Sequence, residues 1–421
     1  MIASLYSGIS GLKANTSALA VIGDNIANVN TTGFKVSSVN FSNVFNAAVG
    51  QSKLQIGRGV VMGGISANWN TGTMETTNNA TDLAINGQGM FVVRDPEGTA
   101  QYYTRAGEFE FDKDGYLVNQ DGFRVQGYSI DLAGNVGAMS DITMPHGMSA
   151  PQATSELTMG LNLNSSDTSY ETTITIYDSL GNPQDLTFNF ERDTTYAGTG
   201  TRWDYYVTST NTALSFVPAS TTAYTLAFDS NGVLDAANCT PAPSTANDYH
   251  GIQITGLSPA TNTQTIDWRF LDPDAATASS DGSVTSYGGS SVKNSQTQDG
   301  YPTGMLQGVS VNEDGVFTGL YSNDAMIPFA QITLADFASY SGLLKQGSNL
   351  YSSSLASGNP IYLTPGQGGV GAIAPSSLEM SNADLASEFV DLITSQRAFQ
   401  ANSKVITTSD EVLSELINIK R

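Results

Sequence analysis

The chain has 421 residues, 40% of them hydrophobic, which is enough for two to four domains with packed cores. Its net charge of −22 argues against nucleic acids and anionic membrane surfaces as partners. Only 13% of the residues are charged, so small polar residues must cover most of the surface, as is common in extracellular β-rich proteins.

The single cysteine, Cys239, excludes an intrachain disulfide and a cysteine-based metal cluster. The first residues lack the basic leader and the continuous apolar run of a cleaved signal peptide. No apolar stretch is long enough to span a membrane. We therefore expect no membrane insertion, and export by another route if the protein works outside the cell.

The first predicted element is a helix that ends near Asn28. Its apolar residues Leu5, Leu12, Leu19 and Ile26 recur every seven positions, and Ile9 lies beside this row. This spacing indicates a helix with one apolar face. The Asn-rich run that follows favours turns, and Gly33 can end the helix in a left-handed conformation.

Residues 31–76 and 351–375 are predicted to be extended linkers with short strands, because their apolar residues keep neither helical nor strand spacing for long. The alternative is that residues 31–76 belong to the sheet of the next domain. From Asp82 the pattern becomes β, with short apolar runs separated by turns such as Asp112-Lys113-Asp114-Gly115. Residues 77–147 and 298–350 are therefore assigned to one inner β domain.

Residues 148–297 form a predicted outer β domain inserted into the inner one. Its expected strands are Thr172–Tyr177, Asp185–Phe190, Trp203–Thr208, Tyr224–Phe228 and Thr265–Phe270. Strands at this spacing favour a sandwich or barrel. The Ser- and Gly-rich tract Ala275–Ser295 is typical of a linker or exposed loop.

The last predicted element is a long helix over residues 381–421. Its apolar row is Leu385, Leu392, Phe399, Ile406 and Leu413, and a second row begins at Phe389 but is polar at Gln396, Ser403 and Asp410. Ser381 with Asp384 is a candidate capping box. Because isolated helices are marginal in water, the two terminal helices are expected to be each other's partners. Two ordinary amphipathic helices lying on a globular core would fit the same spacing.

The fold class that follows is α+β and mainly β. The terminal helices, residues 1–30 and 376–421, form a coiled-coil-like core domain, and two or more antiparallel β domains of barrel or sandwich type are inserted between them.

Both ends of the chain also carry longer motifs. The run from Asp24 to Lys35 resembles the signature of the bacterial flagellar rod and hook axial proteins. The tail is similar in the same way, through Leu378-Glu379, Ser381-Asn382, Asp384-Leu385, Phe389 to Ile393 and Gln396 to Asn402. The matching residues are Asn25, Ala27, Asn28, Gly33, Phe34 and Lys35 near the N-terminus and Gln396, Arg397, Gln400 and Asn402 near the C-terminus. Thr173 to Asn182 and Gly300 to Asn323 are similar to hook members of this family.

The resemblance implies a structural subunit of the flagellar hook. Such a subunit polymerises through its terminal helices into a hollow helical tube, which acts as a flexible joint and transmits torque from rod to filament. The implied partners are further copies of itself, the rod protein, the hook cap, the hook–filament junction protein and the type III export apparatus. The implied location is extracellular, in the hook and basal body. The alternatives are another axial protein, such as a distal rod subunit, and a secreted β-rich adhesin or hydrolase.

Signals for chemistry are weak. The turns at Asp112 and Asn312 lack the distal Glu and flanking helices of a calcium loop. Gly366 to Gly371 matches a dinucleotide fingerprint in letters only, because prolines surround it. His146 and His250 are the only histidines, both in loop-like sequence, and no nucleophile elbow is present. We therefore expect no enzymatic activity and assign no catalytic, cofactor or metal residue.

Overall fold

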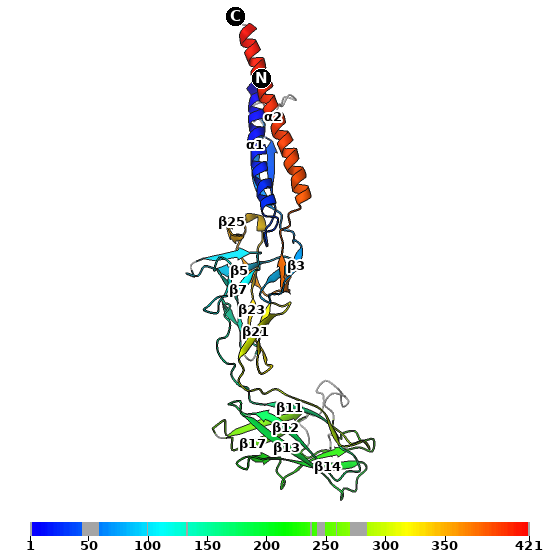
Figure 1. Cartoon of the computed structure of the whole chain (residues 1–421). Coiled ribbons are helices and arrows are strands. Elements are labelled where there is room, and N and C mark those ends of the chain that lie inside the picture. Colours follow the sequence, from blue (N-terminus) through cyan, green and yellow to red (C-terminus); the bar gives the residue numbers. More distant parts are fainter. Residues whose placement is uncertain are drawn as a thin grey trace. The chain divides into compact units, whose positions relative to one another are not determined.

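The structure is a computed structural model that describes residues 2–43, 59–98, 100–131, 134–235, 238–241, 249–257, 259–269 and 284–419. The chain divides into two compact units (Figure 1). Unit 1 comprises residues 1–146, 308–320 and 326–421, and unit 2 comprises residues 147–307 and 321–325. The middle of the chain is therefore inserted into a unit built from its two ends.

Unit 1 begins and ends with the two long helices, α1 (Ile2–Ala27) and α2 (Leu385–Ile419). They pack antiparallel against each other within one chain (Figure 1). We call this pair of helices, which are far apart in the sequence, the helical hairpin. Their packing confirms the prediction that the termini are partners. The start of α2 differs from the expected capping box: the Asp384 carboxylate accepts the Ala386 N–H at 2.9 Å, while the Ser381 hydroxyl bonds to Ala383 before the helix.

A β-hairpin follows α1 in the sequence. Strands β1 (Ser37–Asn43) and β2 (Val60–Ala67) pair antiparallel, and both contact α1. Most of their side chains are exposed, including the apolar Phe41, Val61 and Ile65. This segment was predicted as a linker with short strands, and its described strands form a two-stranded ribbon along the helix.

The remaining strands of unit 1 build the inner sheets. They are β3 (Met74–Thr76), β4 (Leu83–Asn86), β5 (Met90–Arg94), β6 (Gln101–Thr104), β7 (Phe109–Phe111), β8 (Leu117–Asn119), β9 (Arg124–Ile130), β10 (Val136–Asp141), β21 (Leu306–Val311), β22 (Val316–Tyr321), β23 (Met326–Ile332), β24 (Leu334–Asp336), β25 (Leu344–Gly347), β26 (Leu350–Ser352), β27 (Ile361–Leu363), β28 (Ala372–Pro375) and β29 (Ser377–Glu379), with a 3₁₀ turn at Tyr340–Gly342. Strand β9 pairs with β5 and with β23, so the return segment joins the first sheet as expected.

Two short pairings connect the sheet to the helices. Strand β28 pairs with β4, and β29 pairs with β3. Because β29 is followed by α2, and β3 follows β2, these pairings bring the two ends of the chain together at the base of the helical hairpin.

A single turn chemistry closes several of the hairpins. In the turn after β7, the Asp112 side chain accepts the N–H groups of Asp114 and Tyr116, and Gly115 has φ +82°. Turns headed by Asn119, Asp131, Asp178, Asp229 and Asn312 use the same side chain to accept the N–H four residues on. These carboxylates and amides therefore stabilise turns.

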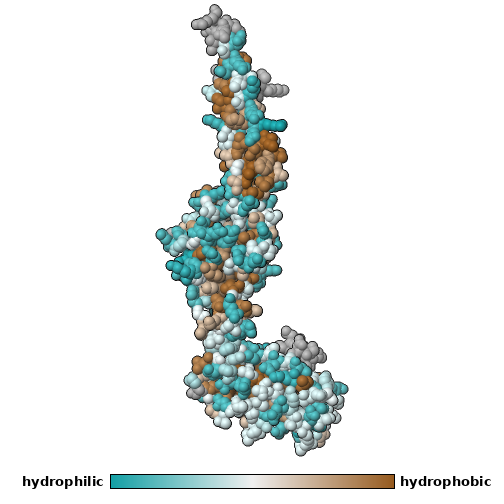
Figure 2. All heavy atoms as spheres, in the orientation of Figure 1, coloured by the Kyte–Doolittle hydropathy of each residue, from teal (hydrophilic) through white to brown (hydrophobic). Residues whose placement is uncertain are grey.

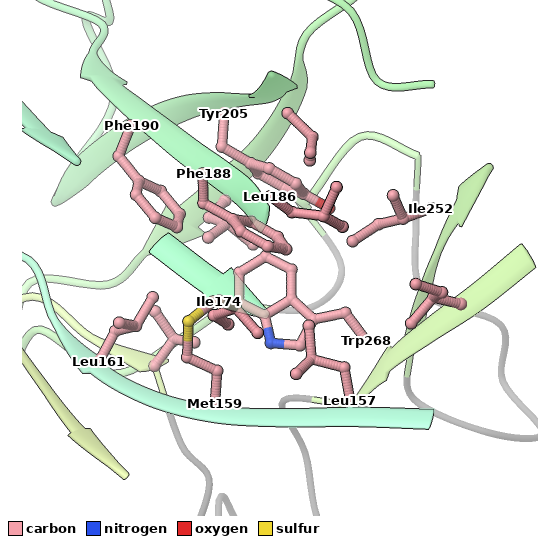
Figure 3. Packing of buried hydrophobic residues seen from close by; sticks show 14 of the residues in the cluster. Leu157, Met159, Leu161, Ile174, Leu186, Phe188, Phe190, Tyr205, Ile252 and Trp268 are labelled. Carbon is pink, nitrogen blue, oxygen red and sulfur yellow. The ribbon is translucent and has the colours of Figure 1, made fainter. Parts of the chain in front are cut away.

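Unit 2 is a sandwich of two sheets. One sheet contains β15 (Ser215–Val217), β17 (Tyr249–Thr255), β18 (Thr263–Arg269), β11 (Glu156–Asn162), β19 (Val284–Thr285) and β20 (Val292–Gln298), and the other contains β12 (Ser169–Tyr177), β13 (Pro183–Arg192), β14 (Thr201–Ser209) and β16 (Tyr224–Phe228). Phe188, Phe190, Tyr205 and Trp268 pack between them (Figure 3). The five predicted strands are all present in the described residues, which do not include Phe270 at the end of the last one.

Two expectations about this unit were wrong. The end of the Ser- and Gly-rich tract is not a loop, because β20 pairs with β11 from Leu157 to Asn162. Residues 275–283 lie outside the described residues. His250 is not in a loop either: it is 1% exposed on β17, its Nδ1 is 2.8 Å from the Tyr205 hydroxyl and its Nε2 is 2.8 Å from the Pro241 carbonyl. Strand β20 has a mostly polar sequence, which gave no strand pattern.

The architecture confirms the predicted fold class, with terminal helices packed together and β domains between them. No helix in the described part of the chain carries an apolar stretch of the length needed to cross a bilayer.

Candidate functional site

The two terminal helices meet along small and polar residues. A Cβ added at Gly11 would lie 2.9 Å from the Asn402 amide, and one added at Gly8 would lie 3.1 Å from Ile406. Gly8, Gly11, Ala14 and Ala18 are all buried. The lack of bulk on α1 lets the helix axes approach closely. Sequence reasoning missed this row, although Gly11, Ala18 and Asn25 recur every seven residues.

A hydrogen-bonded group ends the helical contact at its base. Asn25 is 1% exposed, and its Nδ2 donates to the Glu388 carboxylate at 3.1 Å and to the Ser37 carbonyl at 2.9 Å. The Asn25 Oδ1 accepts the Ser37 N–H at 3.0 Å. One amide thus connects α1, β1 and α2, which explains in physical terms why Asn stands at this signature position.

Below this group lies a buried ion cluster centred on Glu379. The carboxylate accepts a hydrogen bond from Lys35 Nζ at 2.6 Å and from Arg105 at 3.1 Å, and the three side chains are at most 1% exposed. The Gly72 N–H also donates to it at 2.9 Å. Burial lowers the pKa of the Lys35 ammonium, and the neighbouring Glu379 opposes this shift. We refer to Lys35, Arg105 and Glu379 as the Glu379 cluster.

The backbone at Gly33 places the N-terminal signature, Asp24 to Lys35, against this cluster. Gly33 has φ +69°, its N–H donates to the Glu379 carbonyl at 2.7 Å, and an added Cβ would lie 2.5 Å from Ala106 N. A larger residue at position 33 would therefore be strained and would also clash. Phe34 is buried, with Lys345 Nζ 5.4 Å from its ring centre.

Asn382 provides a second connection between the chain ends. Its Oδ1 accepts the Val36 N–H at 2.9 Å, and its Nδ2 donates to the carbonyls of Asn68 and Asn70 at 2.9 and 3.0 Å. Glu379 and Asn382 belong to the tail motif of the flagellar resemblance, and Glu388 lies in the first turns of the predicted helix, but the sequence did not predict their buried contacts. Arg105 carried no signal, because it is 274 residues from its partner.

The predicted polymerisation residues are distributed over several faces of the hairpin. Leu5, Leu12, Leu19 and Ile26 on α1 are half-buried, as are Leu392, Phe399, Ile406 and Leu413 on α2. Ile9, Leu385 and Phe389 are exposed. The second α2 row turns away from α1 at Gln396 and Asp410, and the row that meets α1 instead contains Glu388 and Asn402.

The remaining signature residues also differ in position. Asn28 Nδ2 donates to the Asp24 carbonyl at 2.9 Å, which caps the end of α1, whereas Ala27 is exposed. Gln396, Arg397 and Gln400 are exposed on α2, and Asn402 is half-buried against Gly11. The N-terminal signature therefore shapes the base of the hairpin, while three of the four C-terminal residues face outward.

An apolar patch remains uncovered at the base of α2 (Figure 2). Its side chains are Leu385, Phe389, Val390 and Ile393, between 42% and 59% exposed. We call these four residues the α2 patch. Contiguous exposed apolar surfaces on soluble proteins usually mark sites of interaction.

The His, Cys, Asp and Glu side chains of the described residues are dispersed. The described residues contain no group of three or more such side chains placed to hold a metal ion. Cys239 is buried and donates to the Asp235 carbonyl, and burial raises the pKa of its thiol. This environment fits a small core residue.

Four family descriptions match successive parts of the chain. They are "Flagella basal body rod protein" over residues 5–35, "Flagellar hook protein FlgE/F/G D1 domain" over 84–160, "Flagellar basal body protein FlaE D2 domain" over 161–301 and "Flagellar basal body rod FlgEFG protein C-terminal" over 374–419. Over its full length the chain is 32% identical to the flagellar hook protein FlgE of Borreliella burgdorferi, with 100% of both chains covered. The chain belongs to the flagellar hook protein FlgE family.

Other hook proteins agree with this assignment. The chain is 31% identical to FlgE of Salmonella typhimurium, covering 99% of this chain and 100% of that one, and 32% identical to FlgE of Escherichia coli, covering 98% of each. The crystal structure of Helicobacter pylori FlgE2 has a similar fold, with a TM-score of 0.51 at 16% identity over 73% of this chain and 100% of that one.

Membership of the hook family decides the function at a broad level. The protein is a structural subunit of the flagellar hook, an extracellular component of the flagellum, and it is not an enzyme. The two terminal family matches, residues 5–35 and 374–419, contain Lys35 and Glu379. The Glu379 cluster is therefore where the two terminal regions of a hook subunit join.

Proposed function

We propose that the subunit polymerises through its helical hairpin, α1 with α2, into a hollow helical tube. The observation that carries this proposal is the apolar surface that the hairpin leaves uncovered after its two helices have packed. Half-buried leucines line both helices, and the α2 patch is exposed beside them. In a monomer this surface faces water, whereas neighbouring subunits would cover it, so burial favours assembly.

The predicted four-part division gives each region a separate role. In this proposal residues 1–30 and 376–421 make the polymer core, and residues 31–76 and 351–375 connect it to the inner β domain of residues 77–147 and 298–350. Residues 148–297 form the outer domain. The sheets of unit 1 and those of unit 2 each have a hydrophobic core of their own. This supports the separation of the β domains from the helices.

A tube with a continuous helical core and separately folded β domains can serve as a flexible joint that transmits torque from rod to filament. Only 13% of the residues in the chain are charged, so neighbouring β domains can slide past one another at small cost while the core stays intact. We also propose contacts with the rod protein, the hook cap and the hook–filament junction protein at the ends of the polymer.

Export through the flagellar type III apparatus in an unfolded form is part of the same proposal. The sequence contains one cysteine, so no disulfide has to break before export or form after it. The pairing of α1 with α2, and of Lys35 with Glu379, joins residues from opposite ends of the chain. These contacts can form only after the whole chain has emerged.

The proposal is tested by placing a charge in the apolar row. Leu392→Lys introduces an ammonium into a half-buried row that neighbours should cover. We expect no tubes by negative-stain electron microscopy, and an unchanged circular dichroism signal from the β domains. Thr221→Lys, at an exposed position of unit 2, is the matched control and should polymerise. Normal tubes from Leu392→Lys would contradict a role of this row in assembly.

A further inference from the structure

We propose that the α2 patch of one subunit docks into a hollow beside α1 of a laterally adjacent copy of the same chain. This inference rests on the proposed function, because it requires polymerisation through the hairpin. To the proposed function it adds the identity of the two surfaces that meet between neighbouring subunits. A head-to-tail contact of this kind uses two different surfaces of each subunit, so it can repeat without closing on a pair.

The hollow is lined mainly by apolar and aromatic side chains of unit 1. It has a volume of about 410 Å³, and its walls include Val21 of α1, Ile65 of β2, and the rings of Trp69, Tyr340 and Tyr351. Trp69 lies 5.3 Å from Tyr340 and 5.1 Å from Tyr351 between ring centres. We call it the Trp69 hollow. Such aromatic pockets are the preferred receptors for a protruding apolar anchor at protein interfaces.

The α2 patch has the properties of that anchor. Leu385, Phe389 and Ile393 follow one another at four-residue intervals, so they form one ridge, with Val390 next to it. Phe389 is 50% exposed and is the aromatic member. The ridge itself contains no charged side chain, so its burial removes no charge of α2 from water. The charged residues that line the hollow are Asp24 and Lys345.

The two surfaces lie at the same level of the hairpin. Gly11 and Asn25 are fourteen residues apart on α1, and their partners Asn402 and Glu388 are fourteen residues apart on α2. Counting along this antiparallel register places Ala20 and Asp24, which line the hollow, level with Ile393 and Phe389. A neighbour placed side by side, with little shift along the helix axes, therefore presents its patch at the height of the hollow.

The two surfaces also point in different directions. Successive residues of a helix are turned by about 100°, so Ala20 and Asp24 project away from the α1 face that holds Gly11, Ala18 and Asn25. By the same count, Phe389 and Ile393 project away from the α2 face that holds Glu388 and Asn402. One subunit can therefore receive a neighbour at the hollow and present its own patch to the next.

A charge-exchange experiment on the full-length chain tests this pairing. Phe389→Glu and Ile65→Lys each change a side chain that is about half exposed, so both variants should fold. Each alone should raise the protein concentration needed for tube formation by about tenfold or more, a change of at least 1.4 kcal/mol. The double variant should recover most of this loss, because the carboxylate introduced on α2 of one copy then meets the ammonium introduced on β2 of the next.

The matched control combines Phe389→Glu with Val61→Lys, which is equally exposed on the same strand but does not line the hollow. Recovery with Ile65→Lys and not with Val61→Lys supports the pairing. Equal recovery by both, recovery by neither, or normal tubes from the single variants would overturn it. If the wild-type chain forms no tubes through its hairpin, the proposed function fails instead.

A second measurement needs no substitution. Of the three tryptophans, Trp203 and Trp268 are fully buried and Trp69 is half-buried at the hollow. Acrylamide quenching therefore reports mainly on Trp69. Polymerisation should remove most of this quenching, because the neighbouring subunit covers Trp69. If quenching is the same in tubes as in the monomer, the hollow is still open to solvent and the docking is contradicted.

Discussion

At the scale of single residues, the Glu379 cluster places three charged side chains in the interior of unit 1. Two cations, Lys35 and Arg105, are buried around one carboxylate. Removing one partner of a buried ion pair is strongly destabilising, because the remaining charges stay desolvated without compensation. The cluster thus makes folding at the base of the hairpin depend on residues from both ends of the chain.

Glu379→Gln should therefore destabilise unit 1 by about 3 to 5 kcal/mol, since the amide leaves both cations without a counter-charge. The measurement is urea unfolding followed by circular dichroism, with polymerisation assayed in parallel. Glu75→Gln, an exposed carboxylate on the neighbouring strand β3, is the control and should change stability by less than about 0.5 kcal/mol. Equal effects of the two substitutions would argue against an ion cluster that stabilises the fold.

His250 predicts a pH dependence of unit 2. Burial lowers the pKa of His250 to about 4, compared with 6.5 in an unfolded chain. The unfolded chain therefore binds a proton that the folded unit does not, and stability falls as the pH drops from about 6.5 to 4, by about 3 kcal/mol. Above pH 6.5 both states are neutral, so this contribution is constant.

The measurement is the free energy of unfolding of unit 2 at pH 7 and pH 4.5, followed by the emission of the buried Trp203 and Trp268. His250→Phe should lower stability at pH 7 but reduce its loss on acidification. His146→Gln changes the exposed histidine of unit 1 and should leave the pH dependence as it is. A wild-type unit 2 with the same stability at both pH values would contradict this role of His250.

At the scale of secondary structure, the contact between α1 and α2 depends on small residues of α1. Apolar residues every seven positions predicted both helices correctly. They did not identify the facing row, because Gly8 and Gly11 carry no hydrophobic signal. These two glycines are nevertheless the residues that Ile406 and Asn402 of α2 approach. The bulky rows stand beside the contact, half-buried, and this is the surface assigned above to neighbouring subunits.

Two glycines of α1 provide a matched pair for testing this contact. Gly11→Leu would place a side chain against Asn402, so the helices must separate, with an expected cost of about 1 to 3 kcal/mol. Gly23→Ala meets no atom within 4 Å and should stabilise α1 by about 0.5 to 1 kcal/mol. Thermal unfolding and helix content by circular dichroism measure both. The idea would be wrong if Gly11→Leu left the helix content and melting temperature unchanged.

At the scale of the whole molecule, unit 2 is a separate body whose ends are close together. Met148 and Met305 form an antiparallel bridge, and the Ser149 N–H donates to the Gly304 carbonyl at 2.8 Å. An insertion whose ends pair in this way can be removed without stretching the chain that remains.

Replacement of residues 149–304 by a short Gly-Ser turn should therefore leave unit 1 folded and able to form tubes. The expected change is in tube curvature, because contacts between outer domains are lost while the helical core is kept. Electron microscopy of the polymer and circular dichroism of the monomer are the measurements. If the shortened chain is folded but forms no tubes, the division of labour between helices and outer domain is incorrect.

Local patterns in the sequence determined much of this protein. The spacing of leucines predicted both terminal helices, turns headed by Asp or Asn and closed by Gly predicted the hairpins, and the terminal motifs led to the hook family. These signals are readable because each depends on residues that are close in the chain.

Tertiary structure alone decided which residues meet across long distances. Lys35 and Glu379 are 344 residues apart, and as charged residues in the sequence they indicate exposed positions, yet both are fully buried. The row of α1 that faces α2, the burial of His250 and the Trp69 hollow likewise depend on surfaces that distant segments form together. Local periodicity gives a helix its faces, but the choice of partner for each face depends on packing of the complete chain.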